Sequence, residues 1–317
     1  MTRFGYTLYC EGNDPRSLIE QAVMAEKAGF DFLVISDHYH PWLSEQQHAA
    51  FAWSVLGAVA QATERIELAT MVTCPIIRYH PAIVAQMAAT VGVISGGRFT
   101  LGLGAGERLN EHVVGMGWPA VRVRHMMLRE AIDIIQALWS GQYVSHYGDF
   151  FTVEDARIFD LPDDPIEIFV AASGKVSAKL AAEKADGLCT SDPEKQIVSA
   201  YLQSGGNKGS VWSQVVLAWG KSKEKAAKEL HSNFRFSAGG WKVQAELPNP
   251  VNFDAATKTI TPEDMKADAG PDAQLHVKKA KHYLEAGVNN LAVAYPGKDH
   301  AGFMKFWQKE LKPALLP

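Results

Sequence analysis

The stretch FLVISDHYHPW, residues 32–42, decides the fold. Its first four residues, Phe32–Ile35, form an unbroken apolar run, which is typical of a strand buried on both faces. From Ser36 onward the chemistry changes, because the next residues bring one carboxylate, two imidazoles and an indole. Pro41 lacks the N–H that a strand would need there. Parallel α/β folds place their chemistry at such a position, directly after the C-terminal end of a buried strand.

A repeated unit of helix, turn and strand supports a parallel sheet. Three helical runs end in AEKAGFD (Ala25–Asp31), AAEKADG (Ala181–Gly187) and LEAGVNN (Leu284–Asn290), and a short apolar strand follows each at once. Gly29 and Gly287 suit the left-handed residue that ends a helix. Repeated αβ units indicate parallel strands.

Eight strands are expected along the chain. They cover Phe4–Tyr9, Phe32–Ile35, Ile66–Thr73, Phe99–Gly104, Ile166–Ala171, Gly187–Thr190, 211–220 and Leu291–Tyr295. With intervening helices in about 300 residues, this pattern predicts a (β/α)8 TIM barrel with insertions at its C-terminal mouth. The expected organisation is one domain, 1–317, with insertions at about 140–165 and 237–270, the first a candidate hairpin. A doubly wound sheet is the alternative.

Composition narrows the class of protein. Of the 317 residues, 47 % are hydrophobic and 21 % charged, as in an ordinary globular chain with a full core. The formal net charge of −4 argues against a nucleic-acid or anionic-membrane surface. No apolar run reaches the length of a membrane span. The three cysteines, Cys10, Cys74 and Cys189, have no metal-site spacing and are too few for a disulfide framework, so a cytoplasmic location is expected.

The predicted strand ends offer an acid and a base beside small and aromatic residues, a set suited to a flat organic ring. His38 and His40 form an H-x-H pair, which also occurs in metal-dependent TIM-barrel hydrolases. Such a site needs further histidine and aspartate ligands around the mouth. The other predicted strand ends lack a histidine, so no metal is expected. The metal-dependent hydrolase and two hydrogen-bonded surface imidazoles remain the alternatives at this point.

Two further segments each allow two interpretations. The run LGLGAGERLNE, residues 101–111, lacks the spacing of a dinucleotide fingerprint. Its glycines either permit close backbone packing or let a planar ring lie against Gly104 and Gly106, with Glu107 at the ring's edge. Ser173-Gly174-Lys175 precedes a predicted helix and is either a phosphate site at a helix N-terminus or an ordinary turn with a solvated lysine.

Taken together, the strand-end motifs resemble one family. They are S-D-H-x-x-P-W at residues 36–42, TMVTCP at 70–75, RYHPA at 78–82, G-x-G-E-x-L-N-E at 104–111, ASG at 172–174 and CTS at 189–191. The chain resembles the coenzyme F420-dependent oxidoreductases of the luciferase-like superfamily, in their glucose-6-phosphate dehydrogenase-like branch. The similarity runs from residue 5 to about 191 and resumes near 275.

The resemblance implies an enzyme that exchanges a hydride between C5 of the deazaflavin F420 and a small organic substrate. It assigns four active-site residues to this sequence: His38 as the base for a hydroxyl proton, Glu107 near N1 of the ring, Trp42 over the reacting centre, and Glu11. A histidine that titrates near neutrality suits that task, and a protonated Glu107 would stabilise charge on the reduced ring.

The resemblance also implies the residues that bind F420. They are Asp37, Met71, Val72, Gly104, Ala105, Gly106, Asn110, and the phosphate-binding turn Ser173, Gly174, Lys175 and Val176. The family carries a non-proline cis peptide behind the ring, which corresponds here to Met71-Val72. Its members are commonly homodimers, so a homodimer is expected.

The sequence departs from the family at the sugar-phosphate site. Where those members place a basic residue, this chain has Asp192 and Glu194, and carboxylates repel a phosphate dianion. An alcohol–carbonyl pair or an activated acceptor is therefore expected as substrate, and glucose 6-phosphate is expected to be poor. The rival within the superfamily is an FMN-dependent monooxygenase, and a third class is a non-catalytic deazaflavin-binding protein.

Overall fold

Eight parallel strands close into a barrel in the computed structural model, which describes residues 2–191 and 195–316. Around the barrel the order is β1-β12-β9-β8-β7-β4-β3-β2, and all neighbours are parallel. The strands are β1 (Arg3–Leu8), β2 (Phe32–Ile35), β3 (Glu67–Thr70), β4 (Phe99–Leu103), β7 (Ile168–Ala171), β8 (Gly187–Thr190), β9 (Val211–Val216) and β12 (Asn290–Ala294). Closure confirms the predicted (β/α)8 barrel and rules out the open, doubly wound sheet.

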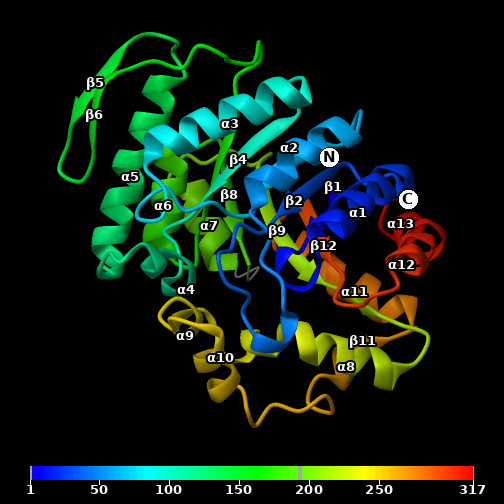
Figure 1. Ribbon diagram of the computed structural model, residues 1–317. Helices are drawn as coiled ribbons and strands as arrows, with labels where there is room; N and C mark the ends of the chain where they lie inside the picture. Colours follow the sequence, from blue (N-terminus) through cyan, green and yellow to red (C-terminus); the bar gives the residue numbers. More distant parts are fainter. Residues whose placement is uncertain (1, 192–194, 317) are drawn as a thin grey trace.

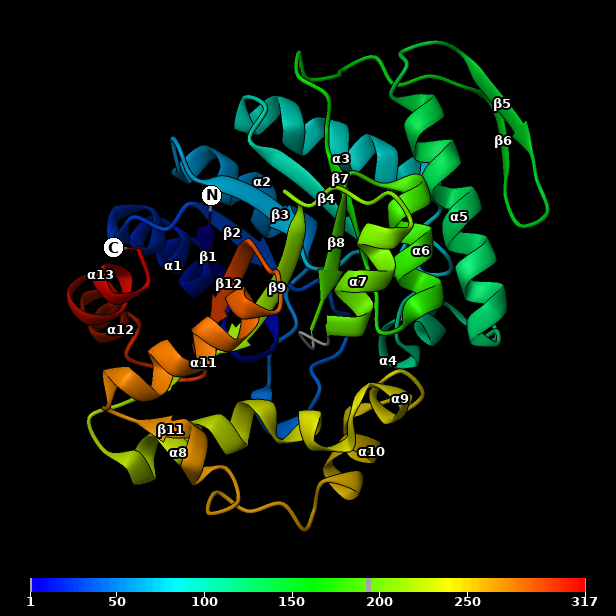
Figure 2. The ribbon, with the colours of Figure 1, turned by 180° about the vertical axis from the view of Figure 1, so that it is seen from behind.

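Helices surround this barrel (Figure 1). They are α1 (Pro15–Ala28), α2 (Ala52–Ala62), α3 (Pro81–Ser95), α5 (Val121–Leu138), α6 (Lys175–Lys184), α7 (Lys195–Gln203), α11 (Ala273–Glu285), α12 (His300–Phe306) and α13 (Lys312–Leu315). The short α4 (Arg108–Glu111) follows β4 directly. The chain termini lie close together beside α1 and α13 (Figures 1 and 2).

Local sequence sets the ends of α1. Asp14 caps its N-terminus, because the Asp14 carboxylate accepts hydrogen bonds from the backbone N–H groups of Arg16 and Ser17. Pro15 occupies the first turn, where a missing N–H costs nothing. Gly29, with φ of 79°, ends the helix in the left-handed conformation. The Asp14 cap contributes about 1 kcal/mol, and the turn at Gly29 starts the chain back toward β2 at a defined residue.

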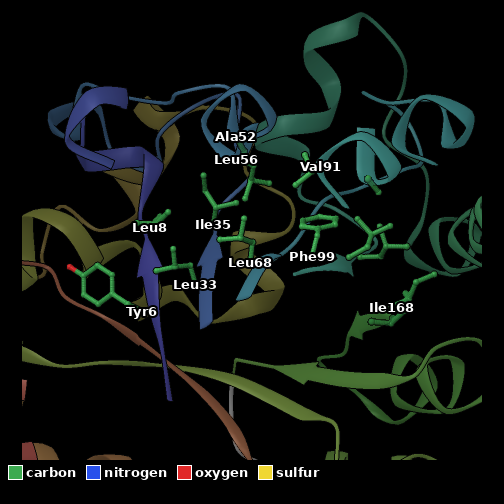
Figure 3. Packing of buried hydrophobic residues seen from close by; sticks show 14 of the residues in the cluster. Tyr6, Leu8, Leu33, Ile35, Ala52, Leu56, Leu68, Val91, Phe99 and Ile168 are labelled. Atoms are coloured by element: carbon green, nitrogen blue, oxygen red, sulfur yellow. The ribbon is translucent and has the colours of Figure 1, made fainter. Parts of the chain in front are cut away.

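Side-chain alternation survives in β2 although every residue of the strand is apolar. Phe32 points into the barrel, where its ring meets the edge of Trp212 at 4.9 Å, and Trp212 stacks on Phe169 at 4.7 Å. Leu33 and Ile35 point outward and pack beside side chains of α2 (Figure 3). The filled interior fixes the strand, so that the residues after Ile35 emerge at the C-terminal mouth.

A layer of helices lies across the mouth. It contains α8 (Lys223–Phe234), α9 (Trp241–Gln244) and α10 (Pro250–Ala256), and Figures 1 and 2 show it at one end of the barrel. The layer thus includes α8 in addition to much of the expected insertion, 237–270. Its apolar side chains pack on residues that follow the strands, among them Tyr9 and Trp42.

The seventh predicted strand is shorter than expected. Of 211–220, only Val211–Val216 belongs to the barrel as β9, and Ala218–Trp219 forms β10, which pairs with β11 (Ala269–Gly270) outside it. Trp219, in β10, stacks on Phe306 of α12 at 5.1 Å. The prediction was too long because the sequence stays mostly apolar beyond Val216, where β9 ends.

The segment 140–165 contains an antiparallel hairpin of β5 (Val144–Tyr147) and β6 (Thr152–Ala156). It joins the C-terminal end of α5 to the start of β7, so it lies at the end of the barrel away from the helical layer (Figure 1). The expectation that both insertions lie at the mouth therefore holds only for the second one.

Candidate active site

Five neighbouring strands bring the candidate residues to one arc of the mouth. The strands β1, β2, β3, β4 and β7 are consecutive around the barrel. Glu11 follows β1, His38 follows β2, Val72 follows β3, Glu107 follows β4 and Ser173 follows β7. Because parallel strands end at the same edge, residues far apart in sequence meet here.

Glu11 and His38 form a buried pair. The Glu11 side chain is completely buried, and its Oε2 accepts a 2.6 Å hydrogen bond from Ser36 Oγ. Its Oε1 lies 3.2 Å from His38 Nδ1. No other donor reaches Oε1 within the described part of the chain. We call these two residues the Glu11–His38 pair.

The surroundings of His38 define its tautomer. Nδ1 lies 3.3 Å from the backbone carbonyl oxygen of His40 as well as 3.2 Å from Glu11 Oε1. The backbone carbonyl oxygen can only accept a hydrogen bond, so we assign the proton to Nδ1. Nε2 then carries the lone pair, which makes it the atom able to take a proton from a substrate.

Burial shifts both members of the pair in the direction that keeps them neutral. Burial, followed by the positive charge of Arg78, lowers the pKa of His38 to about 3. The expectation that His38 titrates near neutrality is therefore wrong for this structure, because an imidazolium there would lack solvation. Burial also raises the pKa of Glu11 to about 7, to which the charges of Glu107 and Asp37 add.

Trp42 belongs to an aromatic wall beside His38. Its ring centroid lies 4.8 Å from that of His38. On the wall itself, Trp42 stacks on Phe236 at 4.4 Å with 4° between the planes, and it meets Phe253 edge-on at 5.2 Å. We call Trp42, Phe236 and Phe253 the aromatic wall. The last two come from the helical layer, so this insertion builds part of the site.

Asp37 is the centre of a second buried cluster. Its Oδ1 accepts from Arg78 Nη2 at 3.0 Å and from the Tyr79 hydroxyl at 3.2 Å. Its Oδ2 accepts from Thr73 Oγ1 at 2.7 Å and from Trp53 Nε1 at 3.2 Å. We call these five residues the Asp37 cluster. Four donors satisfy the carboxylate, so Asp37 ties β2, β3 and α2 together, and its role as an F420 ligand stays a prediction.

Arg78 extends this cluster to the turn after β4. Its backbone N–H donates to Glu111 Oε2 at 2.9 Å, and its Nε lies 3.8 Å from Glu111 Oε1. Burial raises the pKa of Glu111 to about 7, against the lowering effect of Arg78. The guanidinium also lies over the ring of Tyr79 at 4.4 Å. One buried cation thus holds two strand-end loops in place.

Glu107 is positioned through Asn110. Asn110 Nδ2 donates to Glu107 Oε2 at 3.2 Å, while Asn110 Oδ1 accepts from the backbone N–H groups of Tyr39 at 2.9 Å and His40 at 3.3 Å. Burial raises the pKa of Glu107, which favours its protonated form. The structure therefore links Glu107 to the loop that carries His38. The predicted contact of Asn110 with F420 stays a prediction.

The peptide bond between Met71 and Val72 is cis, as the resemblance implied. Neighbouring glycines pack closely against this turn. A side chain on Gly104 would meet Val72 Cγ2 at 2.6 Å, and one on Gly106, where φ is 76°, would meet Cys74 Sγ at 2.6 Å. Protein packing alone thus requires these glycines. Their contact with a ring stays a prediction, and so does that of Ala105, which is half-buried between them.

The turn Ser173-Gly174-Lys175-Val176 leads from β7 into α6. Gly174 is the N-cap residue of that helix and provides no side-chain hydrogen bond to the first amide groups. Ser173, Lys175 and Val176 are exposed. An N-terminus of this kind presents uncapped N–H groups and the positive end of a helix dipole, which suits an anion.

Several residues that build the site were not predicted from the sequence. Arg78, Tyr79 and Thr73 stand within the motifs that carry the resemblance, but no role was predicted for them. The only local signal was a cation, Arg78, in the otherwise apolar segment that follows β3. The remaining ones, with no local sequence signal, are Trp53, Phe236 and Phe253. Asp192 and Glu194 lie outside the described residues.

Across residues 2–191 and 195–316, no three His, Cys, Asp or Glu side chains are grouped so as to hold a metal ion. His40 Nδ1 instead contacts the Leu109 carbonyl oxygen at 3.0 Å. The three cysteines are free and buried. Over the same described ranges, no helix is both long and apolar enough to cross a membrane.

The luciferase-like monooxygenase family matches residues 1–290 of this chain. The chain belongs to the luciferase-like family. Among curated relatives, the F420-dependent glucose-6-phosphate dehydrogenase of Beutenbergia cavernae is 35 % identical, over 99 % of this chain and 98 % of that protein. The enzyme of the same name from Amycolatopsis mediterranei is 34 % identical, over 99 % of both chains.

Solved structures place this luciferase-like chain in the same fold. An F420-dependent secondary alcohol dehydrogenase, in complex with an F420–acetone adduct, matches with a TM-score of 0.90 and 29 % identity over 100 % of this chain and 99 % of its own. The F420-dependent tetrahydromethanopterin reductase of Methanopyrus kandleri matches with a TM-score of 0.77 and 21 % identity, over 99 % of both chains. The second similarity shows the shared fold alone.

Proposed function

We propose that this chain is an F420-dependent oxidoreductase that oxidises a small alcohol, or reduces the matching carbonyl compound. The observation that carries the proposal is the Glu11–His38 pair at the mouth, a buried neutral base held by a carboxyl group and bordered by the aromatic wall. Relatives and a structural neighbour that are named as F420-dependent dehydrogenases support the choice of cofactor.

The residues at the mouth fit a deazaflavin. Met71, Val72 and Ala105 are only half-buried, although most of the residues around them are buried, so they offer apolar surface to a planar ring. Glu107, also half-buried, lies at the edge of this surface with a raised pKa. The uncapped turn at Ser173 follows the adjacent strand β7 and would hold the phosphate.

Bound F420 would supply C5 as the acceptor or donor of a hydride. His38 takes the hydroxyl proton at Nε2 while the hydride leaves the alcohol carbon. The proton on Nδ1 is then held between Glu11 Oε1 and the His40 carbonyl oxygen, which stabilises the imidazolium despite its burial. With F420 bound, a protonated Glu107 would donate a hydrogen bond to the ring and stabilise the negative charge that reduction adds to it.

The substrate we propose is small and apolar. The aromatic wall places Trp42 beside His38, and its partners Phe236 and Phe253 add apolar surface from the helical layer. Asp192 and Glu194 in the sequence oppose a phosphate group. A secondary alcohol or ketone therefore fits better than glucose 6-phosphate, although several relatives are named for that sugar phosphate.

Two titrations test the proposal. F420 should bind at least tenfold more tightly than FMN, a difference of about 1.4 kcal/mol, measured by fluorescence quenching. Equal or tighter FMN binding would favour the monooxygenase. Reduction of F420 is then followed in absorbance with a panel of small secondary alcohols and with glucose 6-phosphate. A kcat/KM for glucose 6-phosphate above about 10⁴ M⁻¹s⁻¹, the lower end for ordinary enzymes, would contradict the substrate assignment.

We further propose a homodimer in the cytoplasm. Ile83, Val93 and Ile94 of α3 are exposed apolar side chains, which supports contact with a second copy. Three unpaired cysteines are in keeping with a reducing compartment. Light scattering of the purified protein measures the assembly, and cell fractionation measures the location.

A further inference from the structure

The side chain of Ser36 lies between the turn that follows β1 and the carboxyl group of Glu11. Strands β1 and β2 are parallel neighbours, and their last residues, Leu8 and Ile35, are register partners that lie side by side (Figure 3). Ser36 comes directly after β2, and its backbone N–H donates to the Leu8 carbonyl oxygen at 3.4 Å. The pairing of the two strands therefore holds Ser36 beside the turn that carries Glu11.

Two contacts fix the direction in which the Ser36 hydroxyl group donates. Its Oγ accepts a hydrogen bond from the backbone N–H of Cys10 at 3.0 Å. The same Oγ lies 2.6 Å from Glu11 Oε2, which is the one acceptor within its reach among the described residues. The hydroxyl hydrogen therefore belongs to the bond with Oε2, since a backbone N–H can only donate.

This hydrogen bond leaves Oε1 as the oxygen of Glu11 that meets His38. Oε1 lies 3.2 Å from His38 Nδ1, while Oε2 is occupied by Ser36. A neutral Glu11 would carry its proton on Oε1 and would need the lone pair of Nδ1. An ionised Glu11 instead accepts a hydrogen bond from Nδ1–H. Only the second arrangement leaves the lone pair on Nε2, the atom that takes the substrate proton in the proposed function.

The surroundings of Glu11 oppose its ionised form, and Ser36 favours it. Burial raises the pKa of Glu11 to about 7, and the hydrogen bond from Ser36 is the strongest influence that lowers it. The other titratable groups that face Glu11 or His38 are Tyr9, Cys10, Asp37, His40, Arg78 and Glu107. The charges of Asp37 and Glu107 add to the rise. Ser36 thus acts against both burial and charge.

We propose that Ser36 is a positioning residue that selects the tautomer of His38 able to act as a base. Its hydroxyl group holds Oε2 and so directs Oε1 of an ionised Glu11 at Nδ1 of His38. Ser36 is 7 % exposed, and it acts through Glu11 rather than by touching the substrate. The inference rests on the proposed function, because the tautomer affects turnover only if His38 takes the proton of the alcohol.

A double-mutant cycle separates this role from packing. Ser36→Ala should lower kcat for F420 reduction about tenfold, whereas KM for the alcohol and the Kd of F420 should change less than about threefold. In the Glu11→Gln background the same substitution should change kcat by less than about twofold, because the carboxyl group through which Ser36 acts is gone. Ser36→Thr keeps the hydroxyl group and should recover most of the lost kcat.

The pH dependence of stability gives a second readout, which needs no cofactor. Stability from Glu11 is lost as pH rises from 4.5 to about 7, because folding raises the pKa of Glu11. Loss of the Ser36 donor raises that pKa further, so in Ser36→Ala the decline should continue to a pH about one unit higher. In the Glu11→Gln background, Ser36→Ala should lower stability equally at every pH. Urea denaturation measures all four proteins, and Glu107, present in each, cancels.

Ser95→Ala is the matched control. Ser95 is also buried, and its Oγ donates to the Gly92 carbonyl oxygen at 3.1 Å at the C-terminal end of α3. This variant loses one buried hydroxyl group as Ser36→Ala does, and it should keep wild-type kcat and the wild-type pH range of the decline. If Ser36→Ala does not fold, Ser36→Cys takes its place in each comparison, because a thiol is a weak donor.

Two results would overturn the inference. One is the same fall in kcat with and without the Glu11 carboxyl group, which would make Ser36 a packing residue. The other is a stability curve of Ser36→Ala parallel to that of the wild type. In both cases the wild type still reduces F420, so the proposed function stands. A wild type that reduces F420 with no alcohol would overturn the proposed function, while the stability curves would still report whether Ser36 acts on Glu11.

Discussion

Two buried carboxyl groups at the ends of adjacent strands, Asp37 after β2 and Glu11 after β1, have opposite surroundings. Asp37 receives four hydrogen bonds from the rest of the Asp37 cluster. Among the described residues, Ser36 is the one side chain that donates a hydrogen bond to Glu11, and His38 Nδ1 lies 3.2 Å from its other oxygen. Both side chains are fully buried. The two carboxyl groups therefore do not differ in burial. They differ in the number of hydrogen-bond donors that surround them.

The number of hydrogen-bond donors gives the two carboxyl groups different roles: Asp37 holds loops in place, whereas Glu11 can take part in proton transfer. A buried carboxylate that accepts hydrogen bonds at both oxygens holds its partners in place, and loss of the cationic partner leaves a buried charge unpaired. A carboxyl group with one donor and a raised pKa can exchange a proton with its neighbour. We therefore expect changes in the Asp37 cluster to lower stability and changes in the Glu11–His38 pair to lower turnover.

The largest effect is expected for His38→Ala. Loss of the base at Nε2 should lower turnover by about 10²–10⁴-fold, the usual contribution of a general base. F420 affinity should change by less than about threefold, because a fall in kcat without a loss of binding marks an interaction of the transition state. Steady-state kinetics and fluorescence titration measure the two quantities.

His48→Ala, an exposed histidine, is the control for His38 and should keep wild-type turnover. Near wild-type turnover of His38→Ala would make His38 a packing residue. Loss of F420 binding would make it a cofactor ligand, and Glu11 or His40 would then be the next candidates for the base.

The next effect concerns stability. Arg78→Met removes the cation that Asp37 and Glu111 share, and leaves a buried carboxylate without its partner. The free energy of unfolding should fall by about 3–5 kcal/mol. Urea denaturation measures it, with the exposed Arg16→Met as control. A loss of less than about 1 kcal/mol would show that the Asp37 cluster does not hold the loops.

A third effect is the pH dependence of stability that Glu11 causes. Its pKa is about 7 in the folded chain and about 4.5 when exposed, so folding takes up a proton between these values. Stability from this residue is therefore lost as pH rises from 4.5 to 7, by about 3 kcal/mol. Glu11→Gln removes the effect, and should be more stable than the wild type at pH 8 and similar at pH 5.

His38 contributes in the opposite direction. Its pKa falls from 6.5 to about 3 on folding, so stability from this residue is lost as pH falls through that range. Between pH 4.5 and 6.5 the two residues change the free energy of unfolding in opposite directions as pH rises. In His38→Ala only the decrease caused by Glu11 should remain. Denaturation at several pH values decides it, and parallel curves for wild type and Glu11→Gln would refute the shift of Glu11.

The smallest effect is expected for Glu107→Gln. The amide keeps the shape and can still donate a hydrogen bond, but it cannot supply a proton. Turnover should fall about tenfold, less than for loss of a whole transition-state donor. The exposed Glu64→Gln serves as control. Unchanged turnover and unchanged F420 affinity together would remove Glu107 from the ring's surroundings.

Local patterns predicted the barrel because its strands are short apolar runs between clear helix ends. Phe32–Ile35 and Gly187–Thr190 were predicted with the bounds that the structure has. The strand predicted over 211–220 was too long, because an apolar run does not tell which neighbour a strand pairs with. Register in a sheet depends on distant partners, and a single stretch does not contain them.

The site was predictable only in part, for the same reason. His38 and Trp42 lie within one motif, so their proximity follows from the chain itself. The pKa of His38 depends on burial and on Arg78, forty residues away, and the expectation of titration near neutrality failed there. Phe236 reaches Trp42 from a segment without helical period, so no local pattern predicted that contact.

The aromatic wall has a consequence for how this protein can diverge. The ring is expected to contact residues that follow β1 to β7, whereas Phe236 and Phe253 come from a single later segment between β9 and β12. Recombination or drift within that one segment can reshape the space for substrates while leaving the cofactor's contacts and the proton relay intact. Substitutions in one gene can thus change the substrate range without changing the redox chemistry.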